Sequence, residues 1–285
     1  MKKDNKPYIH NFPKAYPDKD FTHMVIADKV YDFNYDENFP YRLKDPKSKF
    51  IRFWVRAGIL IIVKPFCYIR YLLRIKGKKN IRAYKRLAPK KGMITICNHT
   101  TEWDCLLVMT SRFFHFSEFP IWQEGAEGKS GYMYRYAGGI VMPTLSYKGM
   151  NYAYEAMREV VKEGKWLHAF PEAACWPYFP GIRSFRIGIF KLAVEENMPI
   201  LPTVVKYRRP NAIYRIFKKQ PNATLLIGTP IAPDLSLEPK ARIMDMHDRC
   251  RKEMLTLLGL DEQSNKALID SLPKYHVESK PLFKE

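Results

Sequence analysis

The sequence predicts an α/β fold, with a mostly parallel central sheet that helices cover. Two observations predict it: short apolar runs rich in β-branched residues recur along the chain, and stretches with a helical period separate them. Strands that alternate with helices favour a parallel sheet, because each parallel connection needs a crossover long enough to hold a helix. Polar residues placed directly after some of these runs indicate a site at the strand ends.

The predicted elements follow from these periods. The predicted strands are residues 93–97, 119–123, 139–142, 166–170, 200–206 and 223–228. The predicted helices are residues 103–112, 149–163, 184–196 and 238–258, and a loop runs from the second strand to residue 137. The strand at 93–97 is bounded by Gly92 and Asn98, and Gly164 is placed to end the helix at 149–163.

A histidine and an aspartate follow the strand at 93–97. His99 and Asp104 lie five positions apart, on the turn that leaves the carboxyl end of that strand. A neutral imidazole can take a proton from a hydroxyl, and a carboxylate can fix its tautomer and stabilise the imidazolium that forms. The pair therefore indicates general-base chemistry on a substrate hydroxyl, although the same spacing also arises by chance.

Further motifs accompany this pair along the chain. They are, in order, Asn98 to Asp104, Gly138-Gly139-Ile140-Val141, Phe170-Pro171-Glu172, Phe185-Arg186-Ile187-Gly188, Met198 to Val205, and Ile227-Gly228-Thr229-Pro230-Ile231. In order and spacing these blocks resemble the glycerolipid acyltransferase family, the 1-acylglycerol-3-phosphate O-acyltransferases. The resemblance covers roughly residues 50 to 258 and implies an acyltransferase-like fold.

The resemblance also implies a reaction. A fatty acyl group would pass from an acyl thioester, either acyl-CoA or acyl carrier protein, to a hydroxyl of a glycerolipid acceptor such as lysophosphatidate, with no other cofactor. His99 would be the general base and Asp104 would orient it, with direct attack on the thioester and no acyl-enzyme. Glu172 would lie at the acceptor end of the cleft; a helix N-cap or a strand-end carboxylate is the alternative for this residue.

Two blocks depart from the family pattern at positions that hold the acceptor. Thr144 stands where the family has an arginine that binds the acceptor phosphate, and Ala173-Ala174-Cys175 replaces Gly-Thr-Arg. Arg183 and Arg186 follow the Phe-Pro-Glu block and are the candidates to bind an anionic acceptor or carrier phosphate instead. A solvated basic face is the alternative for both arginines. We therefore expect acyl transfer with a rebuilt acceptor site.

The composition of residues 46–80 predicts an amphipathic helical segment at a membrane interface. No acidic residue occurs between Pro46 and Thr101, against fifteen lysines and arginines. Within residues 46–80 the longest uncharged run, Ala57 to Val63, is far shorter than the roughly 20 residues that span a bilayer, so we expect in-plane helices that are broken near Pro65. Anionic lipids at the cytoplasmic face would hold this segment peripherally. The alternative is a buried helix with a solvated basic end.

The length of 285 residues fits one large domain, with an N-terminal arm at 1–45, an acyltransferase domain at 46–260 and a C-terminal tail at 261–285. The formal net charge of +19 implies an anionic partner, but no signature of a nucleic-acid-binding motif is present. Five cysteines without zinc spacing predict neither disulfides nor a metal site. A non-catalytic lipid-binding or scaffold protein on the same fold is the alternative function.

Overall fold

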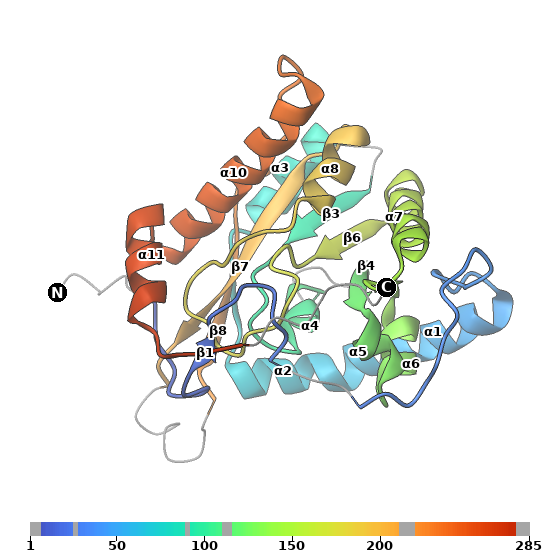
Figure 1. Cartoon of the computed structure of the whole chain (residues 1–285), viewed down its shortest axis with the longest axis horizontal. Coiled ribbons are helices and arrows are strands. Elements are labelled where there is room, and N and C mark those ends of the chain that lie inside the picture. The colour runs from blue at the N-terminus through green and yellow to red at the C-terminus, as the bar shows by residue number, and fades with distance from the viewer. Residues whose placement is uncertain (1–6, 25–27, 89–91, 110–115, 211–219, 278–285) are drawn as a thin grey trace.

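A seven-stranded sheet forms the centre of the molecule (Figure 1). The computed structural model describes residues 7–24, 28–88, 92–109, 116–210 and 220–277. The strands of this sheet are β2 (Arg74–Lys76), β3 (Met93–Ile96), β4 (Ser117–Trp122), β5 (Gly139–Met142), β6 (Trp166–Ala169), β7 (Ile200–Arg208) and β8 (Asn222–Ile227). They lie in the order β2-β8-β7-β3-β6-β4-β5, and every neighbouring pair is parallel except β7 and β8. The mostly parallel α/β fold predicted from the sequence is confirmed.

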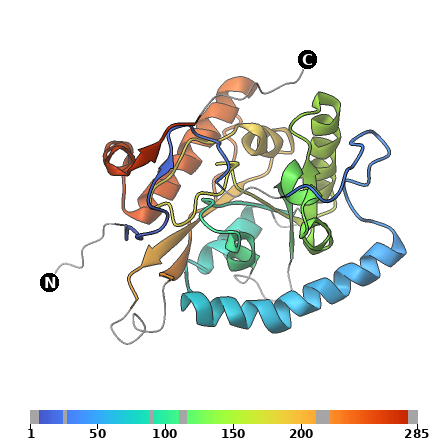
Figure 2. The ribbon, with the colours of Figure 1, turned by 60° about the horizontal axis from the view of Figure 1, so that its bottom comes forward.

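Helices cover both faces of the sheet. They are α1 (Pro46–Gly58), α2 (Lys64–Tyr71), α3 (Lys79–Leu87), α4 (Asp104–Met109), α5 (Gln123–Glu127), α6 (Gly131–Ala137), α7 (Tyr147–Lys162), α8 (Gly188–Glu195), α10 (Pro239–Leu258) and α11 (Glu262–Ser271). Figure 2 shows α7, α8 and α10 on one side of the sheet, and α1 with α2 along the other. The central strands are buried on both faces, so Ile94, Ile96 and Leu167 are inaccessible to solvent.

The two ends of the described chain meet on the surface of the domain. The short strands β1 (Tyr16–Pro17) and β9 (Lys274–Tyr275) pair in parallel. The ring of Tyr16 stacks on Trp176 with the centroids 5.8 Å apart, and Leu272 belongs to the same small apolar cluster. The N-terminal arm therefore lies against the loop that follows β6.

The prediction of a loop up to residue 137 is wrong, because this region contains α5 and α6. The structure packs Gly125 against the side chain of Trp122, where a Cβ has no room. Glu127 is buried and accepts a hydrogen bond from the hydroxyl of Tyr35 at 3.0 Å. Contacts with the N-terminal arm thus stabilise helical turns that the local sequence does not favour.

The helix predicted at 184–196 begins only at Gly188. The backbone N–H of Arg183 donates to Oε1 of Glu172 at 2.9 Å, and that of Arg186 donates to the carbonyl of Pro171 at 2.7 Å. The residues before α8 are therefore bound to the loop after β6 instead of to a helical turn. The helix predicted at 103–112 begins at Asp104, and its residues 110–112 lie outside the described residues.

The basic segment forms one continuous helical rod, so the break expected near Pro65 is wrong. A π-helical turn at Ile59–Val63 joins α1 to α2, and the residues at both junctions keep right-handed helical angles. The wider turn ends two residues before Pro65 and accommodates a residue that has no N–H to donate. Strand β2 and helix α3, which follow the rod, have no counterpart in the sequence analysis. Within the described ranges, no helix has both the length and the apolar character needed to cross a membrane.

Candidate active site

The candidate site lies at the carboxyl ends of β3 and β6, which are neighbours in the sheet. Ile96 is in register with Ala169, and the N–H of Cys97 donates to the carbonyl of Ala169 at 3.1 Å. The loops that leave the two strands therefore start side by side. One of them carries His99 and the other carries Glu172, so the sheet brings the two motifs together.

The side chain of Asn98 attaches the first of these loops to β7. Its amide oxygen accepts a hydrogen bond from the N–H of Val205 at 2.8 Å, and its amide nitrogen donates to the carbonyl of Val205 at 3.2 Å. The amide thus replaces a backbone partner for β7 at the point where the chain leaves the sheet.

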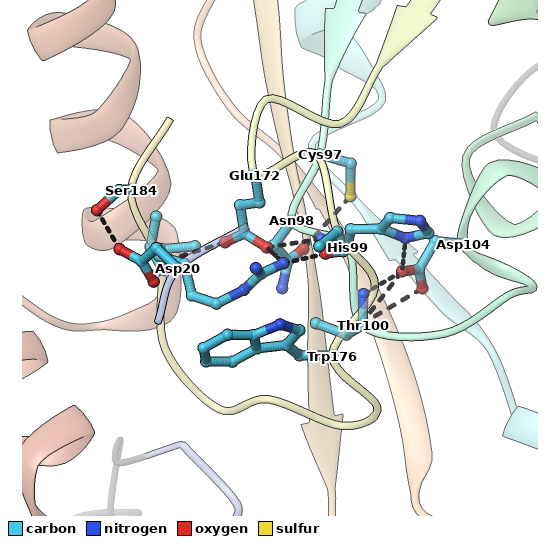
Figure 3. Close-up of polar contacts among 12 residues, drawn as sticks. Asp20, Cys97, Asn98, His99, Thr100, Asp104, Glu172, Trp176 and Ser184 are labelled. Carbon is cyan, nitrogen blue, oxygen red and sulfur yellow. Dashed lines mark hydrogen bonds and ion pairs between the residues drawn. The ribbon is translucent and has the colours of Figure 1, made fainter. Parts of the chain in front are cut away.

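The carboxylate of Asp104 organises the turn that follows β3 (Figure 3). It is fully buried and accepts hydrogen bonds from the N–H of Thr100, from the N–H of Thr101 at 2.7 Å and from the hydroxyl of Thr101 at 3.1 Å. The hydroxyl of Thr101 accepts in turn from the N–H of Trp103 at 3.0 Å, as in a capping box at a helix start. Nδ1 of His99 lies 3.3 Å from Oδ2 of the same carboxylate.

The imidazole of His99 is held by its neighbours but leaves 22% of the side chain exposed. It stacks on the ring of Phe170 with the centroids 4.1 Å apart, and the backbone N–H of His99 donates to Oε2 of Glu172 at 3.0 Å. The segment that carries Cys175 lies beside His99, because the N–H of Trp176 donates to the carbonyl of His99 at 3.1 Å. Burial disfavours the charged ring, but Cys175 and Asp104 outweigh this effect and raise the pKa of His99 to about 10.

Glu172 and Arg183 form a buried ion pair beside His99. The carboxylate of Glu172 accepts from the backbone N–H and from the guanidinium of Arg183, both at 2.9 Å. The guanidinium also donates to the carbonyl of Ala174 and lies 4.4 Å above the ring of Trp176. With 2% of its surface exposed, Arg183 is not part of a solvated basic face. Its charge is directed at Glu172, and Glu172 fixes the backbone of His99.

The other two predicted acceptor residues do not join this cluster. Arg186 is exposed, and its guanidinium lies 3.7 Å above the ring of Phe21 in the N-terminal arm. Thr144 is exposed in the turn after β5, an edge strand that β4 separates from β6. The structure therefore brings together His99, Asp104, Glu172 and Arg183, and places Arg186 and Thr144 outside their hydrogen-bonded network.

Sequence reasoning missed two contributors to the site. The first is Cys175, whose only signal is that it replaces an arginine of the family pattern three residues after Glu172. The second is the N-terminal arm, where the carbonyl of Thr22 accepts from the indole N–H of Trp176 at 2.7 Å. No periodicity indicated that contact. Among the residues that the structure describes, no three His, Cys, Asp or Glu side chains are arranged to hold a metal ion.

The part of the chain that holds this site matches a known family. Residues 73–206 match the family model for acyltransferases. The chain carries an acyltransferase domain. The matched residues run from β2 into β7 and include the cluster around His99, so the resemblance drawn from the motifs is confirmed. The chain is also similar to the crystal structure of the 1-acyl-sn-glycerophosphate (LPA) acyltransferase PlsC from Thermotoga maritima, with a TM-score of 0.46 and 18% identity over 74% of this chain and 83% of that chain. No curated protein matches the chain by sequence.

The backbone at Ala173, within the matched region, is strained, and this strain can be tested. Its φ is +60°, in the left-handed region that costs a residue with a Cβ about 1–2 kcal/mol. Glycine removes this cost but adds unfolded-state entropy worth about 0.4–1 kcal/mol. We predict that Ala173→Gly raises the free energy of unfolding in urea by about 0.5–1 kcal/mol. The matched control Ala193→Gly, inside α8, should lower it by about 1 kcal/mol or more. Equal destabilisation by both changes would contradict the assignment of strain to Ala173.

Proposed function

We propose that this chain is an O-acyltransferase that moves a fatty acyl group from an acyl thioester, either acyl-CoA or acyl carrier protein, to a hydroxyl of a lyso-glycerolipid such as lysophosphatidate. One observation carries the proposal: the buried carboxylate of Asp104 holds Nδ1 of the partly exposed His99 at the end of a central strand. With Nδ1 taken, Nε2 is the ring nitrogen that accepts a proton when the ring is neutral. The match to the acyltransferase family model supports the reaction class.

His99 acts on the acceptor hydroxyl. Nε2 takes the proton of the hydroxyl as its oxygen attacks the acyl carbonyl, and Asp104 stabilises the imidazolium that forms. Glu172 contributes by fixing the backbone of His99, and Arg183 by fixing Glu172. A proton-transfer group has to be held closely for such a step, and these buried contacts supply that restraint.

The acceptor binds in a rebuilt site. Thr144, at the position of the family's phosphate-binding arginine, carries no charge, and the guanidinium of Arg183 is engaged by Glu172. Arg186 is the exposed cation whose backbone is bonded to the loop after β6, and Phe21 covers one face of its guanidinium. Arg186 is therefore the candidate for the anionic headgroup of the acceptor.

The helical rod of α1, the π turn and α2 lies on the cytoplasmic surface of the membrane. Large apolar side chains are exposed along it, with 45–74% of each accessible: Phe50, Phe53, Trp54, Ile61, Ile62, Phe66 and Ile69. An exposed apolar stripe among basic residues is typical of an interfacial helix that binds anionic lipids. The ring of Phe66 also packs against the ring of Trp103, with the centroids 5.6 Å apart. Trp103 directly precedes Asp104 in the sequence. The lipid-facing surface thus continues to the site.

The role of His99 can be tested by its removal. We predict that His99→Ala lowers the release of free thiol from palmitoyl-CoA, with lysophosphatidate as acceptor, by about 10²–10⁴-fold, because the general base is lost. Circular dichroism should show a folded variant. The control His276→Ala, an exposed histidine in the tail, should keep the wild-type rate. If His99→Ala keeps more than about a tenth of the wild-type rate, His99 is not the general base.

The membrane surface can be tested by sedimentation with vesicles that contain phosphatidylglycerol. We predict that the triple change Ile61→Ser, Ile62→Ser and Ile69→Ser weakens binding by at least about tenfold at high salt, where the charge contribution is screened and the apolar contribution remains. Leu235→Ser, an exposed apolar residue ahead of α10, serves as the matched control. Wild-type binding by the triple variant would place the lipid contact elsewhere.

A further inference from the structure

The outer side of helix α3 carries only positive charge. Its cations, which we call the α3 patch, lie at the N-cap and along the helix and are all exposed: Lys78, Lys79, Arg82, Lys85 and Arg86. They recur at intervals of three and four residues, so they share one side of the helix. The nine residues of α3 extend over about 13 Å, so the patch is a row of separate charges along a straight surface.

The inner side of α3 is fixed to the central sheet. The hydroxyl of Tyr84 donates to the carbonyl of Pro199 at 2.8 Å and accepts from the N–H of Ile94 at 3.0 Å. Only 1% of Tyr84 is exposed. The side-chain amide of Asn80 donates to the carbonyl of Ile227 at 2.9 Å. The α3 patch is therefore held in place by the fold and always faces outward.

The charge of the α3 patch is not compensated within the described parts of the chain. On other helices the basic side chains meet carboxylates: Arg158 of α7 pairs with Glu196, and Arg251 of α10 pairs with Glu262. Among the residues that the structure describes, no cation of the α3 patch forms such an ion pair. The segment from Pro46 to Thr101 explains this difference, because it contains no acidic residue.

Neighbouring cations are affected by this excess charge. Burial lowers the pKa of Lys64 in α2, and the charge of Lys78 lowers it further. Burial also lowers the pKa of Lys206 in β7, and the charge of Lys76, on the edge strand β2, adds to this effect. Like charges that lie close together destabilise a folded chain unless an opposite charge neutralises them. The excess therefore indicates a partner that brings negative charge.

The first turn of α3 lies level with the end of β3. Ile227, which accepts from Asn80, is in register with Thr203 of β7, and the hydroxyl of Thr203 donates to the carbonyl of Ile96 at 2.7 Å. Neighbouring strands are about 4.8 Å apart, so the step from β8 to β3 covers roughly 10 Å. The loop that carries His99 leaves β3 directly after Ile96 and Cys97. The patch thus begins near the edge of the sheet that holds the site.

The composition of the α3 patch favours an acidic protein over a lipid surface. The rod of α1, the π turn and α2 has a stripe of exposed apolar side chains, as an interfacial helix requires, whereas Leu87 is the one large apolar side chain of α3 that is exposed, at 56%. A polar surface with separate like charges is typical of an interface that attracts and orients a protein of opposite charge. Of the two proposed donors, acyl carrier protein is an acidic protein.

We propose that the α3 patch is the docking surface for an acidic acyl carrier protein that delivers the acyl thioester. The proposal rests on the proposed acyl transfer and selects one of its two donors. Carboxylates of the carrier pair with the lysines and arginines of the patch. The carrier holds its acyl group on a flexible prosthetic arm, which can extend from α3 to the carboxyl end of β3. Direct transfer to the acceptor hydroxyl beside His99 is unchanged.

Charge reversal on α3 tests the docking surface. The patch variant is Lys79→Glu, Arg82→Glu and Arg86→Glu, and its matched control makes the same change in net charge at exposed lysines of α10 and α11: Lys240→Glu, Lys252→Glu and Lys266→Glu. Each protein is assayed with palmitoyl-acyl carrier protein and with palmitoyl-CoA, and lysophosphatidate is supplied in neutral detergent micelles so that vesicle binding does not contribute. Circular dichroism should show that both variants are folded.

We expect the patch variant to lose at least about tenfold in kcat/KM with palmitoyl-acyl carrier protein, mainly through KM, because electrostatic attraction of the carrier is lost. With palmitoyl-CoA it should stay within about twofold of wild type, and the control should stay there with both donors. Fluorescence anisotropy of labelled acyl carrier protein should show the same loss of affinity without any turnover. High salt should weaken carrier binding by the wild type, because it screens the attraction.

Three results would overturn the docking surface. One is a patch variant that binds and uses palmitoyl-acyl carrier protein within about twofold of wild type. Another is an equal loss with both donors, which would assign the patch to a step that they share. The third is a patch variant that loses only its binding to anionic vesicles, which would make α3 a lipid contact.

Failure of this proposal is distinct from failure of the proposed function. A wild-type protein that acylates lysophosphatidate from palmitoyl-CoA but not from palmitoyl-acyl carrier protein overturns the docking surface and leaves the acyltransferase intact. A protein that binds acyl carrier protein through the α3 patch but acylates no lysophosphatidate supports the docking surface and contradicts the proposed acceptor.

Discussion

The buried carboxylate of Asp104 is the constraint on which the site depends. A carboxylate removed from water has to be fully hydrogen-bonded, and Asp104 meets this requirement with the turn that presents His99. The same oxygen that accepts from the backbone of the turn also accepts from the imidazole. The fold of the loop and the orientation of the imidazole are therefore one arrangement, because the five-residue spacing lets one carboxylate serve both.

A second buried carboxylate ties this loop to the rest of the domain. Glu172 accepts from the backbone of His99 on one side and from Arg183 on the other, so the loops after β3 and β6 cannot move independently. The carbonyl of Arg183 accepts in turn from Arg251 of α10 at 2.6 Å. A buried pair of this kind is costly when one partner is lost. Arg183, which the motif suggested for a substrate phosphate, thus lies in a buried ion pair with Glu172.

The sequence predicted the parts of the fold and site whose signals are local. The strand before His99 is a short apolar run, and the His99 to Asp104 spacing places both residues on one turn, so both were found without knowledge of the rest of the chain. The pairing of Glu172 with Arg183 was missed because it joins residues 11 apart through an irregular loop, where no period applies. Cys175 and the helices α5 and α6 depend on tertiary contacts, which no single-sequence pattern reports.

The most direct measurement is the acyl-transfer rate of Asp104→Asn together with its melting temperature. An asparagine oxygen can still accept from the N–H of Thr101, so the account predicts little change in melting temperature. The charge that stabilises the imidazolium is lost, so the rate should fall by roughly ten- to a hundredfold or more. A variant that keeps both its stability and a rate within about twofold of wild type would contradict the claim that Asp104 and His99 act together in catalysis.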